Sequence, residues 1–211
     1  MILKIRGFLK NIFSGLFRTK KHVRLGFYGP VNSGKSTLAN KICMDWLGEE
    51  MTTASKVPHE TREIKVKEKV TIESKEGKKL DFNLIDTPGI ATKIDYQEFM
   101  KFKINAKEAK SRAKEATSGV IEAIKWLDQV DCVLVVLDST KNPYDQVNIT
   151  IIGNLAARNT PVLIVGNKID LKNAKLKQIE NAFPQYNIIG ISAEKGLNME
   201  EFYQSVFELV K

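Results

Sequence analysis

Two uninterrupted apolar runs constrain the fold of this chain more than any other feature. The segments "DCVLVVLD" (131–138) and "PVLIVGN" (161–167) show no polar alternation, as expected of strands that are covered on both faces of a parallel sheet. Further strands are predicted at 22–28, 63–74, 80–85 and 186–192, and helices at 34–47, about 145–158, 172–182 and 198–210. This alternation predicts an α/β fold with a doubly wound, mostly parallel, six-stranded sheet flanked by helices.

Charge divides the chain into a short basic segment and a nearly neutral remainder. The 211 residues carry a net charge of +8 at pH 7, and the first 21 residues contribute six positive charges and no acid. We therefore expect a basic N-terminal segment at 1–21 and one domain at 22–211. Because residues 22–211 carry only a small excess of positive charge, the net charge of the protein is weak support for nucleic-acid binding. Cys43 and Cys132 lie within apolar elements and are expected to be reduced core thiols of a cytoplasmic protein.

The stretch "GPVNSGKST" (29–37) joins a predicted strand to a predicted helix. Its glycines allow backbone N–H groups to turn inward around an anion, and the start of the helix offers further amides without partners. Lys35 can reach the β- and γ-phosphates of a nucleotide, and the Ser36 hydroxyl can ligate Mg²⁺. The loop therefore predicts a nucleotide-phosphate site. Its candidate residues are Gly29, Asn32, Ser33, Gly34, Lys35, Ser36 and Thr37.

A second candidate group follows the predicted strand at 80–85. In "DTPG" (86–89), Asp86 at the strand end can hold a Mg²⁺-bound water, and the Gly89 amide can meet a γ-phosphate. Such a tetrapeptide is a weak signal alone. Several of them in order, each at the carboxyl end of a predicted strand, together indicate one ligand site.

Two further motifs predict recognition of guanine. "NKID" (167–170) follows a buried strand, and the Asp170 carboxylate suits the two donors of the guanine edge, a pair that adenine lacks. Asn167 would fix neighbouring groups, and the Lys168 stem would lie along the base. "SAEK" (192–195) follows the sixth strand, where the Ala193 amide could contact the guanine oxygen. The candidates at this end of the site are Asn167, Lys168, Asp170, Ser192, Ala193 and Glu194.

Together, "GPVNSGKS", "DTPG", "NKID" and "SAEK" resemble the motifs of P-loop GTPases of the TRAFAC class, most closely its Era/TrmE-like branch. The resemblance covers residues 22–210. It implies GTP binding, hydrolysis of GTP to GDP and phosphate with Mg²⁺, and two mobile switch segments. The protein would then act as a nucleotide-dependent switch.

The resemblance also implies a threonine ligand to Mg²⁺ in the first switch. It should lie just before the second strand, and "ETREIKV" places Thr61 there, much as an Era-like "TTR" does. Thr52 and Thr53 remain the alternatives, although both fit a flexible loop better. The candidate catalytic residues are Lys35, Thr61 and Gly89, and the candidate Mg²⁺ ligands are Ser36, Thr61 and, through water, Asp86.

Two positions bear on the rate of hydrolysis. Ile90 follows Gly89, where Ras-like GTPases have a water-orienting glutamine, so hydrolysis by the isolated domain is expected to be slow; the Era-like branch shares this substitution. In cation-activated members of the branch, an asparagine matching Asn32 helps to hold K⁺ beside the phosphates, which predicts stimulation by K⁺. The alternative for Asn32 is a turn residue that tolerates unusual backbone angles.

The region at 90–130 is longer than a short switch and an average helix require. Apolar and small residues recur there at helical spacing, so we expect a mobile switch II loop that leads into a long helix 2. This helix is either a solvated extension or a nucleotide-controlled surface, at 95–128, for a protein effector. The stripe consists of Ala109, Ala113, Ala116, Val120, Ile124 and Leu127.

Residues 1–18 are predicted to form an amphipathic helix with a basic polar face. Its composition favours an anionic membrane surface, which would place the protein peripherally on the inner face of the cytoplasmic membrane. The alternative is a helix packed on the domain's own core. The apolar face consists of Ile5, Phe8, Leu9, Ile12, Phe13 and Leu16.

Two other functional classes remain open. Era-like ribosome-assembly proteins carry an RNA-binding domain after the GTPase, whereas this sequence ends at Lys211, so we expect that the ribosomal function does not carry over. An RNA- or ribosome-associated GTPase is nevertheless an alternative, because the N-terminal segment and residues 101–114 are rich in cations. The other alternative is a GTP-binding scaffold with negligible hydrolysis.

Overall fold

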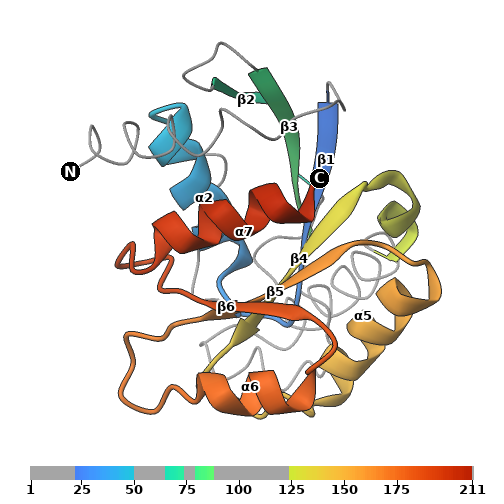
Figure 1. The fold of residues 1–211 in the computed structure, drawn as a ribbon, viewed down its shortest axis with the longest axis vertical. Coiled ribbons are helices and arrows are strands. Elements are labelled where there is room, and N and C mark those ends of the chain that lie inside the picture. The colour runs from blue at the N-terminus through green and yellow to red at the C-terminus, as the bar shows by residue number, and fades with distance from the viewer. Residues whose placement is uncertain (1–21, 50–64, 74–78, 88–123, 211) are drawn as a thin grey trace, which may run out of the picture.

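The computed structural model describes residues 22–49, 65–73, 79–87 and 124–210. These residues form a six-stranded sheet with the order β2-β3-β1-β4-β5-β6 (Figure 1). β2 runs antiparallel to β3, and all other neighbouring strands are parallel. The α/β prediction is therefore confirmed. The strands are β1 (His22–Tyr28), β2 (Lys65–Glu73), β3 (Lys79–Asp86), β4 (Cys132–Asp138), β5 (Val162–Asn167) and β6 (Asn187–Gly190).

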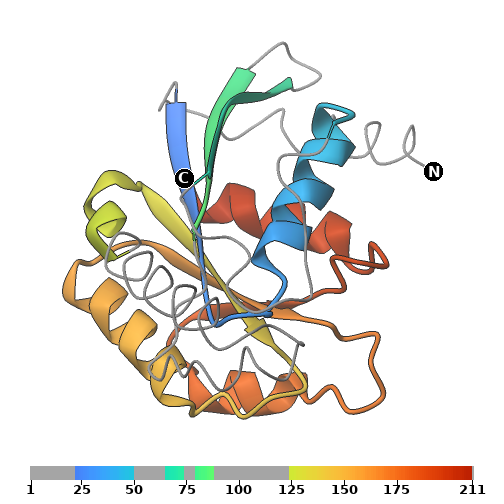
Figure 2. The same ribbon diagram turned by 180° about the vertical axis from the view of Figure 1, so that it is seen from behind.

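Helices cover both faces of the sheet (Figures 1 and 2). β4 shows why its sequence is apolar throughout: Leu134 packs in the core beneath α2 and α7, whereas Val133 and Val135 pack in the core beneath α5 and α6. Burial on both faces thus replaces the alternation that a half-exposed strand would show. The helices are α2 (Lys35–Trp46), α5 (Gln146–Ala157), α6 (Leu176–Ala182) and α7 (Met199–Leu209), and a short 3₁₀ helix, η2 (Trp126–Gln129), precedes β4.

One helix begins later than the sequence predicts. The pattern predicts a helix over 172–182, but α6 begins at Leu176. The preceding residues form turns instead, because the Lys175 N–H donates to the Ser139 carbonyl at 2.8 Å and the Ala174 N–H donates to the Leu171 carbonyl at 2.9 Å. A tertiary hydrogen bond to the end of β4 therefore overrides the local helical pattern.

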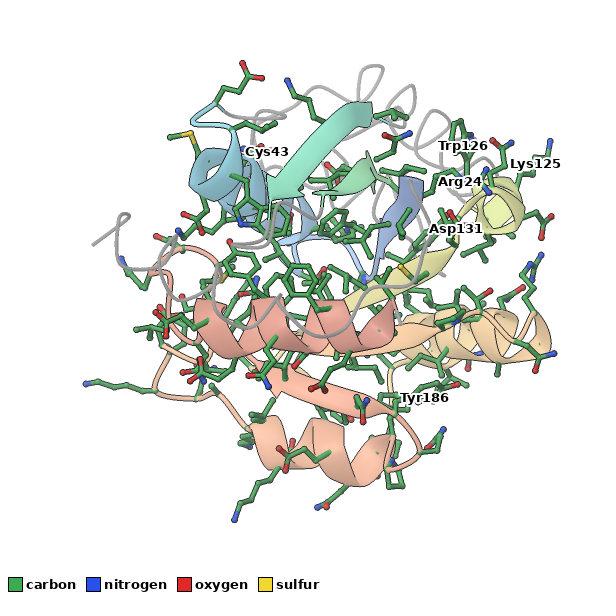
Figure 3. All side chains as sticks on the ribbon, turned by 45° about the horizontal axis from the view of Figure 1, so that its top comes forward. Arg24, Cys43, Lys125, Trp126, Asp131 and Tyr186 are labelled. Carbon is green, nitrogen blue, oxygen red and sulfur yellow. The ribbon has the colours of Figure 1, made fainter. Side chains whose placement is uncertain are left out.

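An ion pair joins the amino-terminal ends of β1 and β4. Arg24 donates to Asp131 Oδ2 from its backbone nitrogen at 2.9 Å and from Nε at 3.3 Å, and the two side chains lie side by side in Figure 3. This contact lies at the end of the sheet opposite to the carboxyl ends of the parallel strands. Both cysteines, Cys43 in α2 and Cys132 in β4, are buried thiols.

Several predictions from the sequence fall outside the described residues. These are the amphipathic helix at 1–18, both switch segments with Thr61, Gly89 and Ile90, and most of the 90–130 region. Only the end of that region is described, where Leu127 is buried and Ile124 packs against the same core. Within the described ranges, none of the helices combines the length and the apolar character that a membrane span requires.

Candidate functional site

The candidate site lies at the carboxyl edge of the sheet. β1 leads into the phosphate loop (29–36), β3 ends at Asp86, β4 ends at Asp138 and β5 ends at Asn167. In the sheet register Asp86 lies beside Phe27, and Asp138 lies beside Asn167. After β1 the chain adds β2 and β3 on one side of β1, and it then crosses to add β4, β5 and β6 on the other side. In open α/β sheets, ligands bind at the carboxyl ends of the strands at such a reversal of strand order.

Two glycines determine the shape of the phosphate loop. Gly29 and Gly34 adopt φ angles of 150° and 96°, which L side chains rarely adopt. A Cβ on Gly29 would lie 2.2 Å from the Val136 carbonyl oxygen, and one on Gly34 would lie 2.2 Å from Asn167 Nδ2. The loop therefore approaches its neighbours as closely as its backbone allows. The positive φ angles turn the backbone of the loop as the predicted anion site requires, and within the loop the Ser33 N–H donates to the Pro30 carbonyl at 3.3 Å.

Lys35 is a buried cation in the first turn of α2. The residue is 5% exposed, and Nζ donates to the Pro30 carbonyl at 3.0 Å within the same loop. Burial lowers the pKa of Lys35 from 10.5 to about 8, although the Asp86 charge opposes that shift. Burying an ammonium is costly unless anions surround it. Nucleotide phosphates would supply those anions, so the loop fits a triphosphate.

Ser36 and Asp86 bring two oxygen ligands together. The Ser36 hydroxyl donates to Asp86 Oδ2 at 2.7 Å, and Asp86 is fully buried. Mg²⁺ is usually held by one or two protein oxygens together with phosphates and waters, so this pair fits the predicted Mg²⁺ site. Thr61, the other expected ligand, lies outside the described residues, as does Gly89. Thr37 is half-buried in the same turn of α2.

Thr87 belongs to the site, although the sequence motifs predict no role for it. Its side chain is fully buried, and Oγ1 donates to the Phe27 carbonyl at 2.6 Å. This bond ties the end of β3 to the end of β1 immediately before the phosphate loop. Its position within the "DTPG" motif was the one sequence signal that could have indicated a role for Thr87. Its partner is 60 residues away in the chain, so the sequence pattern does not reveal it.

Asn167 connects three segments of the site. Its Nδ2 donates to the Ser33 carbonyl in the phosphate loop at 3.0 Å. Its Oδ1 accepts from the Lys168 N–H at 2.8 Å and from the Ala193 N–H at 3.0 Å. The Ala193 amide, which the sequence predicts to contact the guanine oxygen, donates to Asn167 in this structure, and the contact with guanine stays a prediction. Asn167 therefore holds the phosphate end and the base end of the site together.

Lys168 joins the same two ends by a second route. Its backbone is left-handed with a φ of 67°, and Nζ donates to the Asn32 carbonyl at 2.7 Å and to Asp138 Oδ2 at 2.6 Å. Asn32 is also left-handed, with a φ of 60°. The sequence motifs predict no role for Asp138, although its position at a strand end is the feature that the other candidates share.

The other residues predicted to bind guanine lie in the turns that follow β5 and β6. Asp170 is half-buried in the turn after β5, and the Ile169 N–H donates to the Ile191 carbonyl at 3.1 Å, which ties that turn to the chain after β6. Ser192 is buried and accepts from the Lys195 N–H at 3.1 Å, so it shapes the neighbouring loop. Glu194 is exposed and points to no described partner other than Lys195, at 3.8 Å.

Comparison with known proteins places the chain among GTPases. A family described as 50S ribosome-binding GTPase matches residues 24–168. GTPase Era of Borrelia garinii subsp. bavariensis is 31% identical over 185 residues, which cover 85% of this chain and 54% of Era. The tRNA modification GTPase MnmE of Chlorobium chlorochromatii is 29% identical over 196 residues, 90% of this chain and 36% of MnmE.

A solved structure agrees with the sequence relatives. The crystal structure of an Aquifex aeolicus Era variant bound to GDP and AlF₄⁻ superposes with a TM-score of 0.68 at 25% identity, over 90% of this chain and 57% of that one. The chain spans about half or less of the length of the curated relatives it matches.

Proposed function

The chain belongs to the 50S ribosome-binding GTPase family, and on this premise we propose that it binds GTP, hydrolyses it to GDP and phosphate with Mg²⁺, and acts as a nucleotide-dependent switch. The observation that carries the proposal is the Asn167 side chain, which bonds to Ser33 in the phosphate loop and to Ala193 beside the guanine motif. A site built this way can hold the phosphates and the base of one nucleotide at a set distance.

The roles proposed for the residues follow from their chemistry. The Lys35 ammonium would lie against the β- and γ-phosphates, and Ser36 with Asp86 would hold Mg²⁺. When bound, Mg²⁺ neutralises charge on the phosphate oxygens. Thr61 and Gly89 would contact the metal and the γ-phosphate, respectively. Because Ile90 cannot orient a water molecule, the isolated protein should hydrolyse GTP slowly.

Asn32 supports a further proposal that K⁺ stimulates hydrolysis. Its side chain is exposed at the phosphate loop, while its backbone carbonyl is held by Lys168. An amide oxygen at this place can ligate a cation beside the phosphates, where added positive charge would stabilise the transition state. The left-handed backbone of Asn32 also agrees with its alternative role as a turn residue.

Where the protein acts is a separate proposal. Residues 1–18 would bind the anionic inner face of the cytoplasmic membrane, and residues 95–128 with the switches would contact a protein effector. The family description favours a second candidate, an RNA- or ribosome-associated GTPase. Binding to liposomes or to RNA at physiological salt distinguishes the two.

Guanine recognition by Asp170 tests the proposed function directly. We expect Asp170→Asn to weaken GTP binding by roughly 2–4 kcal/mol, because the guanine donors lose a charged acceptor. The same variant should gain affinity for xanthosine triphosphate, which carries an oxygen at the matching position. Isothermal titration with GTP, XTP and ATP measures all three affinities.

The matched control removes a carboxylate from the opposite end of the sheet. Asp128→Asn breaks an exposed ion pair with Arg158 and should leave all three affinities unchanged. Wild-type protein that binds ATP as tightly as GTP would contradict the guanine-specific function.

A further inference from the structure

Asp138 is held in place by both of its carboxylate oxygens. Oδ2 accepts from Lys168 Nζ at 2.6 Å, and Oδ1 accepts from the Thr140 N–H at 2.9 Å and from Thr140 Oγ1 at 2.7 Å. The side chain of Asp138 is only 11% exposed. Burial by itself would raise the pKa of Asp138, but the hydrogen bonds from Lys168 and Thr140 outweigh it and hold the pKa below its ordinary value. Asp138 is therefore a fixed anion.

The sheet register explains why this anion meets Lys168. Asp138 is the last residue of β4 and lies beside Asn167, the last residue of β5. The next residue after Asn167 is Lys168, whose left-handed backbone is a conformation that non-glycine residues adopt only when their surroundings compensate for it. Its ammonium is fixed at one side by Asp138 and at the other by the Asn32 carbonyl.

We propose that Asp138 is a positioning residue of the nucleotide site, which holds the Lys168 ammonium so that the lysine stem lies along the guanine base and the phosphate loop stays attached to the base end. This inference rests on the proposed function, because it assigns a role in guanine-nucleotide binding. Without the anion, the Lys168 ammonium has only the neutral Asn32 carbonyl as its described partner, and its long side chain regains rotational freedom.

The test measures how fast the protein releases fluorescent GDP. We expect Asp138→Asn, which keeps the shape and the acceptor for Thr140 but removes the charge, to release GDP about tenfold faster than wild type, as the loss of a charge-assisted hydrogen bond implies. Lys168→Met should also release it faster. Asp128→Asn, which removes an acid from another ion pair, should release it at the wild-type rate.

A double-variant cycle distinguishes positioning from general destabilisation. If Asp138 acts through Lys168, adding Asp138→Asn to Lys168→Met should change the release rate by less than about twofold, because the interaction is already lost. If Asp138 were purely structural, the fold-changes in release rate caused by Asp138→Asn and by Lys168→Met would instead multiply in the double variant. Thr140→Val, which removes one bond to Asp138, should release GDP about threefold faster, and it serves as the test if Asp138→Asn does not fold.

The outcomes separate this inference from the proposed function. Wild-type protein that retains no fluorescent GDP would overturn both. Wild-type protein that retains GDP while Asp138→Asn, or Thr140→Val in its place, releases it at the wild-type rate would overturn the positioning role alone. Multiplicative effects in the cycle would overturn it as well.

Discussion

Lys35 is a single residue whose proposed role in phosphate binding lowers the stability of the nucleotide-free protein. The residue is 5% exposed, and burial lowers its pKa from 10.5 to about 8. A shift of this size corresponds to about 3 kcal/mol of unfavourable free energy for the charged form in the folded protein. The nucleotide-free protein therefore carries a destabilising cation that phosphates would stabilise.

This cost predicts a specific pH dependence of stability. Below about pH 8 Lys35 is charged in both the folded and the unfolded chain, so its full cost is present. Between about pH 8 and 10.5 the unfolded chain binds the proton and the folded chain does not, so the contribution of Lys35 to the free energy of unfolding rises with pH. Nucleotide-free Lys35→Met should thus be more stable than wild type by up to about 3 kcal/mol at pH 7, with the gap closing toward pH 10.5.

Urea unfolding of the nucleotide-free proteins at several pH values measures that gap. Lys172→Met changes an exposed position, so its free energy of unfolding should follow the same pH dependence as that of wild type. Adding GTP should raise the stability of wild type and not that of Lys35→Met. A constant difference between wild type and Lys35→Met across this pH range would contradict the buried-cation account.

At the scale of the structural elements, hydrogen bonds from distant residues hold the phosphate loop. It is bonded at Ser33 by Asn167 and at Asn32 by Lys168, and Gly34 leaves no room for a Cβ against Asn167. These bonds fix the backbone and leave the Asn32 side chain exposed. Two hydrogen bonds thus hold the loop backbone where the phosphates would bind, and the Asn32 side-chain amide remains exposed there.

We expect GTP hydrolysis to be slow and to run faster in K⁺ than in Na⁺ at matched ionic strength. The physical reason is that K⁺ held by Asn32 would add positive charge where the γ-phosphate develops negative charge. Phosphate release under single-turnover conditions in the two salts measures the effect. Asn32→Asp keeps an oxygen ligand and Asn32→Ala removes it, so only the alanine variant should lose the K⁺ response. Equal rates in both salts, or an Asn32→Ala variant that still responds to K⁺, would refute the proposal.

At the scale of the whole molecule, the uneven charge suggests where the protein acts. Six of the positive charges lie within residues 1–21, next to the apolar side chains of the predicted amphipathic helix. Each Lys or Arg near an anionic surface contributes about 1 kcal/mol, and each buried large apolar side chain contributes about 1.5–3 kcal/mol at most. Even half of the sum gives measurable membrane binding.

Sedimentation with anionic and neutral liposomes tests this proposal. The full chain should bind anionic liposomes, whereas a 1–20 deletion and the Phe8→Asp, Ile12→Asp double variant should not, and both should still bind GTP. Replacing Lys20 and Lys21 by Arg keeps the charge and serves as the control. If the full chain stays in the supernatant with GTP and with GDP, or if the deletion unfolds the domain, the segment belongs to the fold and the membrane proposal is wrong.

The sequence by itself determined the fold class and the location of the candidate site. Uninterrupted apolar runs predict strands that are buried on both faces, and the strand–glycine loop–helix arrangement requires only local backbone properties. These signals lie within a few residues of one another. The strand-end rule then placed Asp86, Asn167 and Asp170 at one edge of the sheet, because the carboxyl ends of parallel strands meet there.

The tertiary structure alone decided which side chains meet at that edge. Lys168 meets Asp138 and Asn32 across 30 and 136 residues of sequence, and the Ala193 amide meets Asn167 across 26. The late start of α6 likewise depends on a bond from Lys175 to Ser139. Nothing in the residues next to Asp138 distinguishes it from an ordinary strand end. These contacts exist only when the strands align in register, since each is a hydrogen bond between groups that the chain itself does not bring close.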